Sequence, residues 1–166
     1  MSPRRVLSSA ALAVLPFSLA ACGGEPAAEG EAPAPAADDP PVIEQRQENF
    51  ETIGDSFKAI RTQLEGDSPD MTVITEAATD LNAAALKVEG FFPEGTSVDD
   101  GYDTEALAAI WEKPEQFAEA HQRLVDASAE MITIAQGGDA VAVADQVGVV
   151  GGSCKNCHDN FRLDTD

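Results

Sequence analysis

The stretch Cys154-Lys155-Asn156-Cys157-His158 lies close to the C-terminus of the 166-residue chain. It has the spacing C-x-x-C-H, which is the attachment pattern of a c-type haem. Two thiols three positions apart on a helix lie on nearly the same face, so both can bond to the vinyl groups of one porphyrin. The imidazole that follows them is then placed to act as the proximal ligand of the iron.

Two other uses of this pattern are weaker. A structural zinc site needs about four nitrogen or sulfur ligands. Outside the motif the chain offers only His121 and Cys22, and Cys22 lies at the N-terminus, outside the predicted folded domain. A thioredoxin-like dithiol belongs in a βαβ pattern, and no strand pattern is present. The sequence therefore favours one covalently bound haem c, held by Cys154, Cys157 and His158.

The first 22 residues predict an export signal. Arg4 and Arg5 form a positive region, and Val6–Ala21 is an apolar run too short for a comfortable membrane span. The run ends in Leu-Ala-Ala-Cys22, which resembles a bacterial lipoprotein signal with a lipidated Cys22; the alternative is an ordinary signal cut nearby. In such signals Gly23 after the cysteine favours the outer membrane.

Residues 23–41 contain only Gly, Glu, Pro, Ala and Asp, so they predict a disordered linker between the lipidated cysteine and one folded domain at 42–166. Because haem c is attached to exported chains in the periplasm, the signal and the haem motif support one location. They indicate a periplasmic domain anchored to a membrane by lipid.

Acidic residues dominate the chain, with 30 Asp and Glu against 10 Lys and Arg and a formal net charge of −20. This charge repels nucleic acid and anionic membrane surfaces, and it would steer a basic partner protein toward the domain. A generally solubilising surface explains the same composition equally well.

Apolar residues recur at helical spacing in four segments and predict an all-α fold. The expected helices are 43–64, 70–88, 114–136 and 139–161, with a short turn near 106–111. Gly, Pro and Asp residues separate them. Four helices with mostly short connections predict an antiparallel four-helix bundle with the haem built into its core near the C-terminus.

Two of the stripes contain unusual residues. Arg46 occupies an apolar position in the first stripe, either at the end of the bundle with its charge in water or facing an internal anion such as a haem propionate. The last helix is predicted to bury one stripe and carries three glycines, Gly148, Gly151 and Gly152, which are unfavourable in a helix. A flat macrocycle or another backbone close by would explain them. The predicted stripe comprises Val141, Ala144, Val147, Gly151, Cys154, His158 and Phe161.

The domain resembles cytochrome c′, a class II c-type cytochrome, over essentially all of residues 42–166. The similar segments are Arg46-Gln47-x-Asn49-Phe50, Phe92-Pro93-x-Gly95-Thr96, Ile110-Trp111, and the run from Val150 to Arg162 that contains the haem motif. The last of these is highly specific, and the others are moderately so.

The resemblance implies a left-handed bundle with a five-coordinate, high-spin haem near one end. Proposed roles in the family are electron transfer and nitric oxide handling, with weaker binding of carbon monoxide. Low-spin relatives carry a methionine as the sixth ligand, and Phe50 stands at that position here. By the same resemblance Arg46 and Gln47 belong to the cofactor site, Arg46 near a propionate, and Arg162 lies in the proximal pocket.

Several alternatives stay open. The sixth ligand could instead be His121, Met71 or Met131, in a low-spin protein that only carries electrons. Enzymatic activity is not expected, since no distal His–Arg pair of the peroxidase kind is present near the motif. The expected partners are a periplasmic redox protein, a gas such as nitric oxide, and a second copy joined through the first two helices, as in many family members.

Overall fold

The structure is a computed structural model that describes residues 39–164. Predictions for residues 1–38, including the signal, Cys22 and most of the linker, lie outside the described residues. Within the described part, the chain forms the α-helices α1 (Pro41–Leu64), α2 (Met71–Ala85), α3 (Ala109–Glu112), α4 (Pro114–Gln136) and α5 (Ala140–Phe161), and the 3₁₀ helices η1 (Val88–Phe91) and η2 (Val98–Asp100). None of these helices is long and apolar enough to cross a membrane.

Local signals explain where the helices begin and end. Both α1 and α4 start with proline, whose missing N–H costs nothing in a first turn. The carboxylates of Asp70 and Asp139 accept hydrogen bonds from the first free amides of α2 and α5. Gly138, with φ +76°, ends α4 in a conformation that favours glycine. The second helix is shorter than predicted, because the chain tightens into η1 after Ala85.

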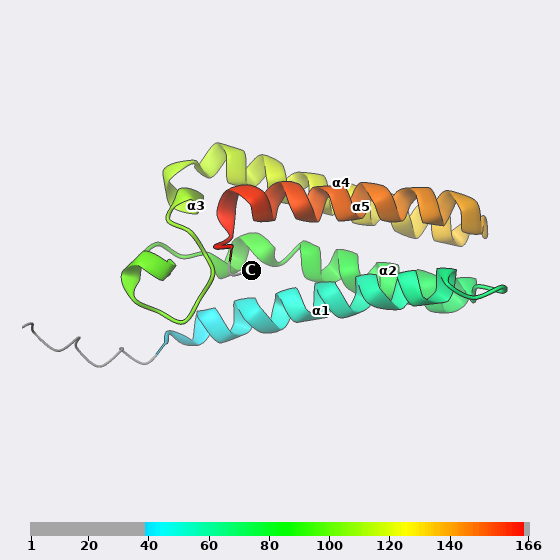
Figure 1. Cartoon of the computed structure of the whole chain (residues 1–166), viewed down its shortest axis with the longest axis horizontal. Helices are drawn as coiled ribbons and strands as arrows, with labels where there is room; N and C mark the ends of the chain where they lie inside the picture. The colour runs from blue at the N-terminus through cyan, green and yellow to red at the C-terminus, as the bar shows by residue number, and fades with distance from the viewer. Residues whose placement is uncertain (1–38, 165–166) are drawn as a thin grey trace, which may run out of the picture. The chain divides into compact units, whose positions relative to one another are not determined.

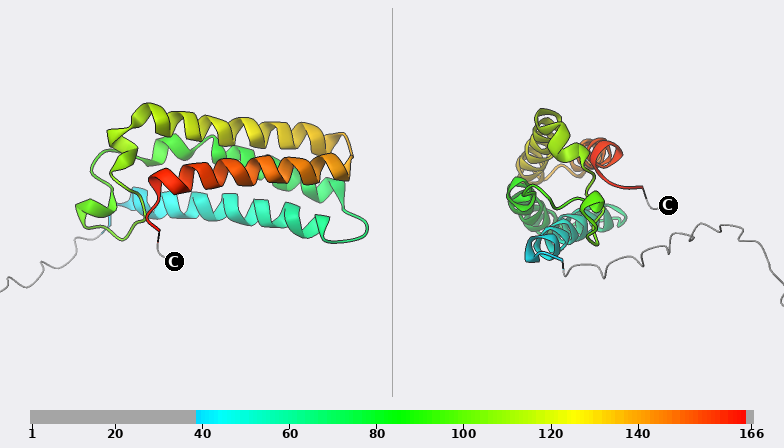
Figure 2. Two further views of the ribbon diagram at one scale, coloured as in Figure 1. Left: turned by 45° about the horizontal axis from the view of Figure 1, so that its top comes forward. Right: turned by 90° about the vertical axis from the view of Figure 1, so that its left-hand side faces the viewer.

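The four long helices form the predicted antiparallel bundle (Figure 1). Close packing joins α1 to α2, α2 to α4, and α4 to α5, whereas α5 touches α1 only sparsely. The right-hand view of Figure 2, which looks along the bundle, shows the pair α4 and α5 facing the pair α1 and α2. The side between α1 and α5 is therefore the open side of the bundle.

The stripe predicted for the second helix is buried throughout and comprises Ile74, Ala77, Ala78, Leu81, Ala84, Ala85 and Val88, the last of which lies in η1. The stripe predicted for α4 is buried up to Met131 and comprises Phe117, Ala120, Leu124, Ala127, Met131 and the half-buried Ile134. The stripe predicted for α5 is wrong in its first half: Val141 is 73% exposed, and Ala144 is exposed as well. Val143, Gln146 and Val150 face the core instead. The Nε2 atom of Gln146 donates to the carbonyl of Ala127 at 2.8 Å, so this polar side chain is satisfied inside the bundle.

The long connection from α2 to α4 closes one end of the bundle (Figure 1). Ala106 forms an antiparallel bridge with Arg162 just after α5, and the Leu163 amide donates to the Glu105 carbonyl at 2.8 Å. This pairing holds the loop against the last turn of α5, where the haem motif lies.

Candidate functional site

A cavity of about 1000 Å³ lies on the open side of the bundle. This volume is at the upper end of the range for small-molecule and cofactor sites, which is about 300–1,000 Å³. Apolar side chains from three helices form most of its walls. They include Phe50, Ile53 and Phe57 of α1, Ala120 and Leu124 of α4, and Phe161 of α5.

All three residues of the haem motif line this cavity from α5: Cys154, Cys157 and His158. The two cysteines are half-buried free thiols. Burial raises the pKa of Cys154, and burial together with the nearby Cys154 raises the pKa of Cys157 to about 11. Both sulfurs are therefore protonated at neutral pH in the chain as described, and both are presented to one apolar space.

The imidazole of His158 is half-buried beside the cysteines. Burial, reinforced by the positive charge of Arg162, lowers the pKa of His158, while Glu105 and Asp159 act in the opposite direction. The neutral ring is favoured, and the neutral imidazole is the form that binds a metal.

Arg46 lies on the α1 side of the same cavity and is only 3% exposed. Its Nη2 donates to the carbonyl of Thr96 at 3.0 Å and to the hydroxyl of Thr104 at 3.1 Å, and its Nη1 donates to the Thr96 hydroxyl at 3.4 Å. The guanidinium carbon is 4.7 Å from the centre of the Phe92 ring. Burial lowers the pKa of Arg46, but a guanidinium stays charged in proteins.

No carboxylate of residues 39–164 forms an ion pair with Arg46. A buried cation without a counter-charge is costly, so the wall of the cavity can accept an anionic group there. The sequence reasoning had left open whether this arginine stands in water or inside; the structure places it inside.

Gln47 and Arg162 also line the cavity but are exposed. The Gln47 amide donates to the Asp103 carbonyl at 3.0 Å, and Arg162 pairs with Glu105 at 3.7 Å. Both residues therefore stand at the mouth of the cavity and tie its rim to the loop.

Phe50 is half-buried and lines the cavity from α1, opposite the helix that carries the haem motif. The centre of its ring lies 6.3 Å from the centre of the Phe92 ring in an edge-to-face contact, and the Phe92 ring centre lies 4.9 Å from that of Phe117. Phe117 continues to Phe161 at 5.4 Å. This aromatic cluster stiffens one side of the cavity and limits where the Phe50 ring can move.

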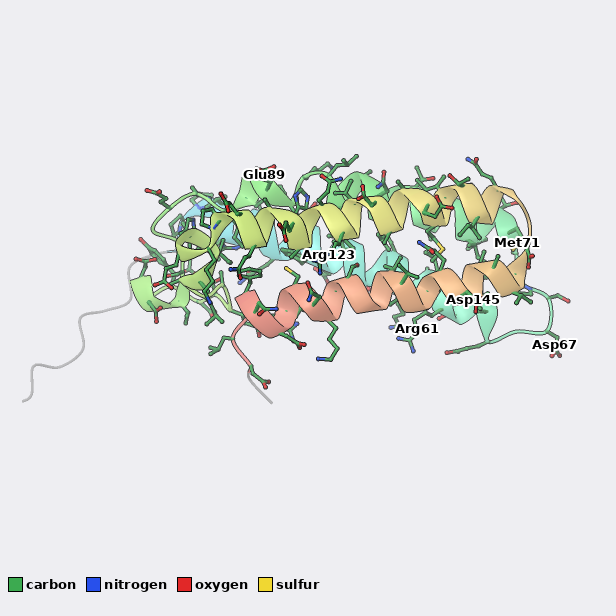
Figure 3. All side chains as sticks on the ribbon, turned by 90° about the horizontal axis from the view of Figure 1, so that it is seen from above. Arg61, Asp67, Met71, Glu89, Arg123 and Asp145 are labelled. Atoms are coloured by element: carbon green, nitrogen blue, oxygen red, sulfur yellow. The ribbon has the colours of Figure 1, made fainter. Side chains whose placement is uncertain are left out.

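The three alternative sixth ligands are placed differently. Met71, at the far end of the bundle from the loop (Figure 3), and the fully buried Met131 do not line the cavity. His121 does line the cavity, but its Nε2 lies 2.9 Å from the carbonyl oxygen of Ala85, the last residue of α2, and forms a hydrogen bond with it. The His121 side chain is half-buried, and this contact holds its ring in place.

The residues present fit a haem. The cavity is apolar, two thiols and a neutral imidazole meet on one wall, and a buried cation stands on another to receive a carboxylate. Gly151 lines the cavity too, where an added Cβ would meet Phe57 at 3.7 Å. Gly148 and Gly152 have no such neighbour among the described residues, since nothing lies within 4 Å of an added Cβ at either position.

Sequence reasoning missed the role of Thr96 and Thr104, which hold Arg46. The segment Phe92-Pro93-x-Gly95-Thr96 stood out as a family-like loop, yet nothing in its residue types pointed to a guanidinium fifty residues earlier in the chain. The carbonyl oxygen of Thr96 is a main-chain group that any residue would supply.

Comparison with known proteins identifies the family of this chain. Residues 41–162 match the family model for cytochrome c′. A cytochrome c′ of Rhodospirillum rubrum is 32% identical over 97% of this chain and 99% of its own. The solved cytochrome c′ of Rhodobacter sphaeroides is 32% identical, with a TM-score of 0.70 over 76% of this chain and 98% of its own.

A third similar structure is a mutant of the cytochrome c′ of Alcaligenes xylosoxidans in complex with nitric oxide. It is 25% identical, with a TM-score of 0.65 over 74% of this chain and 94% of its own.

Proposed function

Because the chain belongs to the cytochrome c′ family, we propose that it binds nitric oxide, transfers electrons, or does both at a five-coordinate haem c. The family carries one covalently attached haem c, and this chain is a haem c cytochrome. The observation that supports the proposal best is that Phe50 and the haem motif line the same apolar cavity.

In this proposal Cys154 and Cys157 would hold the macrocycle by thioether bonds, and His158 would supply a nitrogen ligand to the iron from α5. Arg46 receives a propionate with the donor capacity that Thr96 and Thr104 leave free, and Gln47 and Arg162 stand at the rim. When bound, the haem supplies a redox-active iron that also accepts gas ligands. The protein supplies an apolar surround and the ring of Phe50.

Nitric oxide binding is supported by the chemistry of position 50. A phenyl ring has no lone pair to give to a metal, so it covers the α1 side of the cavity without filling a ligand position. The similar protein from Alcaligenes xylosoxidans was solved as a nitric oxide complex, and the same ligand class is proposed here.

The alternative is a low-spin, six-coordinate cytochrome that only carries electrons. Among the three candidate ligands named from the sequence, His121 is the one that lines the cavity. Its bond to the Ala85 carbonyl would have to break before the ring could turn toward a metal, which makes this alternative weaker.

The proposal places the domain in the periplasm, tied to a membrane through a lipidated Cys22 and the linker, with the outer membrane favoured. Its electron partner would be a basic protein, drawn by the net charge of −20. A homodimer through α1 and α2, implied by the family resemblance, stays a prediction.

Absorption spectra of the ferric and ferrous protein test the proposal. We expect high-spin, five-coordinate spectra in both states and a new spectrum when nitric oxide is added. A low-spin spectrum in the untreated protein, lost in His121→Ala, would instead establish the electron-carrier alternative.

A further inference from the structure

Gly54 is the one glycine of the 24-residue helix α1 and stands in its interior. A glycine in the interior of a helix costs about 1 kcal/mol relative to alanine. Its φ is not in the left-handed region, and no atom outside its own turn of helix lies within 4 Å of a Cβ added there. Neither the backbone nor the packing of residues 39–164 therefore requires glycine at this position.

The position of Gly54 in the cavity suggests what the missing side chain leaves room for. Gly54 follows Phe50 by about one turn, and both residues line the cavity. Helical side chains lean toward the preceding turn, so a side chain at position 54 would lie over the turn that carries Phe50. Phe57 closes the far side of this gap, since its Cζ lies 3.7 Å from a Cβ added at Gly151 on α5.

On its other side the Phe50 ring has a neighbour that cannot yield. Phe92 contacts it edge to face. The Phe92 ring is itself held between the guanidinium of Arg46, at 4.7 Å, and the ring of Phe117, at 4.9 Å. A ring on a helix moves between about two staggered χ1 positions. Displacement toward Phe92 would push a packed cluster, whereas displacement over Gly54 passes a residue without a side chain.

We infer that Gly54 provides the space into which the Phe50 ring moves when a gas binds, so that the residue at position 54 sets how readily the cavity admits a ligand. This inference rests on the gas binding proposed above, in which the ring covers the α1 side of the cavity. A site that is open only while the ring is displaced has its affinity lowered by the fraction of molecules in the displaced state. A side chain at position 54 would make that fraction smaller.

Stopped-flow absorption of the haem-loaded ferrous protein mixed with nitric oxide tests the inference. Gly54→Val fills the gap with a β-branched side chain that has one strongly preferred rotamer in a helix. We expect nitric oxide association to slow by about tenfold, in proportion to the displaced fraction. In a chain that already carries Phe50→Ala, the same change should alter the rate by less than about twofold, because no ring has to move.

Gly148→Val is the matched control. Gly148 is also an exposed helical glycine with nothing within 4 Å of an added Cβ, but it does not line the cavity, so the rate should stay that of the parent. Stability gives a readout that does not depend on gas. Gly54→Ala should raise the urea midpoint and leave haem incorporation unchanged, because alanine favours the helix and crowds no atom.

Each contrary result has a definite meaning. Reduced haem incorporation in Gly54→Ala would overturn the inference, since the glycine would then make room for the macrocycle. An unchanged rate in Gly54→Val would also overturn it while leaving the proposed gas binding intact. Equal slowing with and without the Phe50 ring would mean that position 54 blocks the ligand directly, which contradicts the inference. A parent protein that takes up no nitric oxide would refute the proposed gas binding and the inference together.

Discussion

The guanidinium of Arg46 donates a hydrogen bond of 3.0 Å to the main-chain carbonyl of Thr96, fifty residues further along the chain. This contact fastens the loop between α2 and α4 to the first helix. The loop in turn contributes Thr104 and Glu105 to the wall of the cavity. Arg46 therefore links the shape of the loop to the space in which the haem is held.

Replacing Arg46 should loosen this loop. Arg46→Met removes all three donated hydrogen bonds and leaves the Thr96 carbonyl without its charged donor, so we expect the free energy of unfolding to fall by about 2–3 kcal/mol. Urea denaturation of the haem-loaded protein measures this, and hydrogen exchange of the Val98 amide reports the loop. Lys58→Met, which removes an exposed cation of the same helix, should change stability by less than about 0.5 kcal/mol. Equal effects of the two changes would show that Arg46 does not hold the loop.

Removing the ring of Phe50 should open the α1 side of the cavity. Phe50→Ala deletes a half-buried phenyl group, at a cost of about 1–2 kcal/mol in stability, and should raise the carbon monoxide affinity of the ferrous protein. Carbon monoxide titration followed by absorption measures the change. Phe57→Ala, which deletes a ring about two turns further along the same helix, is the matched control. A larger gain in the Phe57 variant would mean that position 50 does not cover the iron.

Placing a thioether at position 50 should convert the spectrum. Phe50→Met offers a sulfur lone pair from the position that, by the family resemblance, corresponds to the methionine ligand of low-spin relatives, so we expect a six-coordinate, low-spin haem with little affinity for carbon monoxide. Magnetic circular dichroism in the near infrared identifies methionine ligation. Persistence of the high-spin spectrum would place the ring too far from the metal to supply a ligand.

The two thiols should be necessary for covalent attachment. A chain with Cys154→Ala and Cys157→Ala has no sulfur to bond to the macrocycle, so its colour should be lost on extraction with acid–acetone, whereas the parent chain should keep it. The experiment requires export with active cytochrome maturation. A parent chain that carries zinc and no haem after such export would contradict the assignment of the motif.

Cys22 should decide where the protein is found. We expect the parent chain to fractionate with membranes and Cys22→Ser to appear in the soluble periplasmic fraction, because one sulfur carries the lipid. Immunoblots of the two fractions measure the partition. If both proteins are recovered equally in the soluble fraction, the signal is an ordinary one.

The sequence by itself determined the helices and the cofactor. Helix starts depend on prolines and on Asp70 and Asp139, which act on amides two or three residues away, so local patterns reveal them. The spacing of Cys154, Cys157 and His158 is likewise local, and these residues lie within the stretch that matches the family model. The apolar pattern of residues 74–88 is also a local signal, and the stripe that it predicted was confirmed throughout.

Only the tertiary structure decided which face of α5 is buried and what Arg46 touches. The first half of α5 consists largely of valine, alanine and glycine, so the apolar pattern allows more than one seam, and packing against α4 selects Val143 and Gln146 over Val141 and Ala144. The partners of Arg46 include a main-chain carbonyl, which carries no sequence signal. Contacts between segments far apart in the chain depend on where the backbone goes, and that is known only once the bundle has formed.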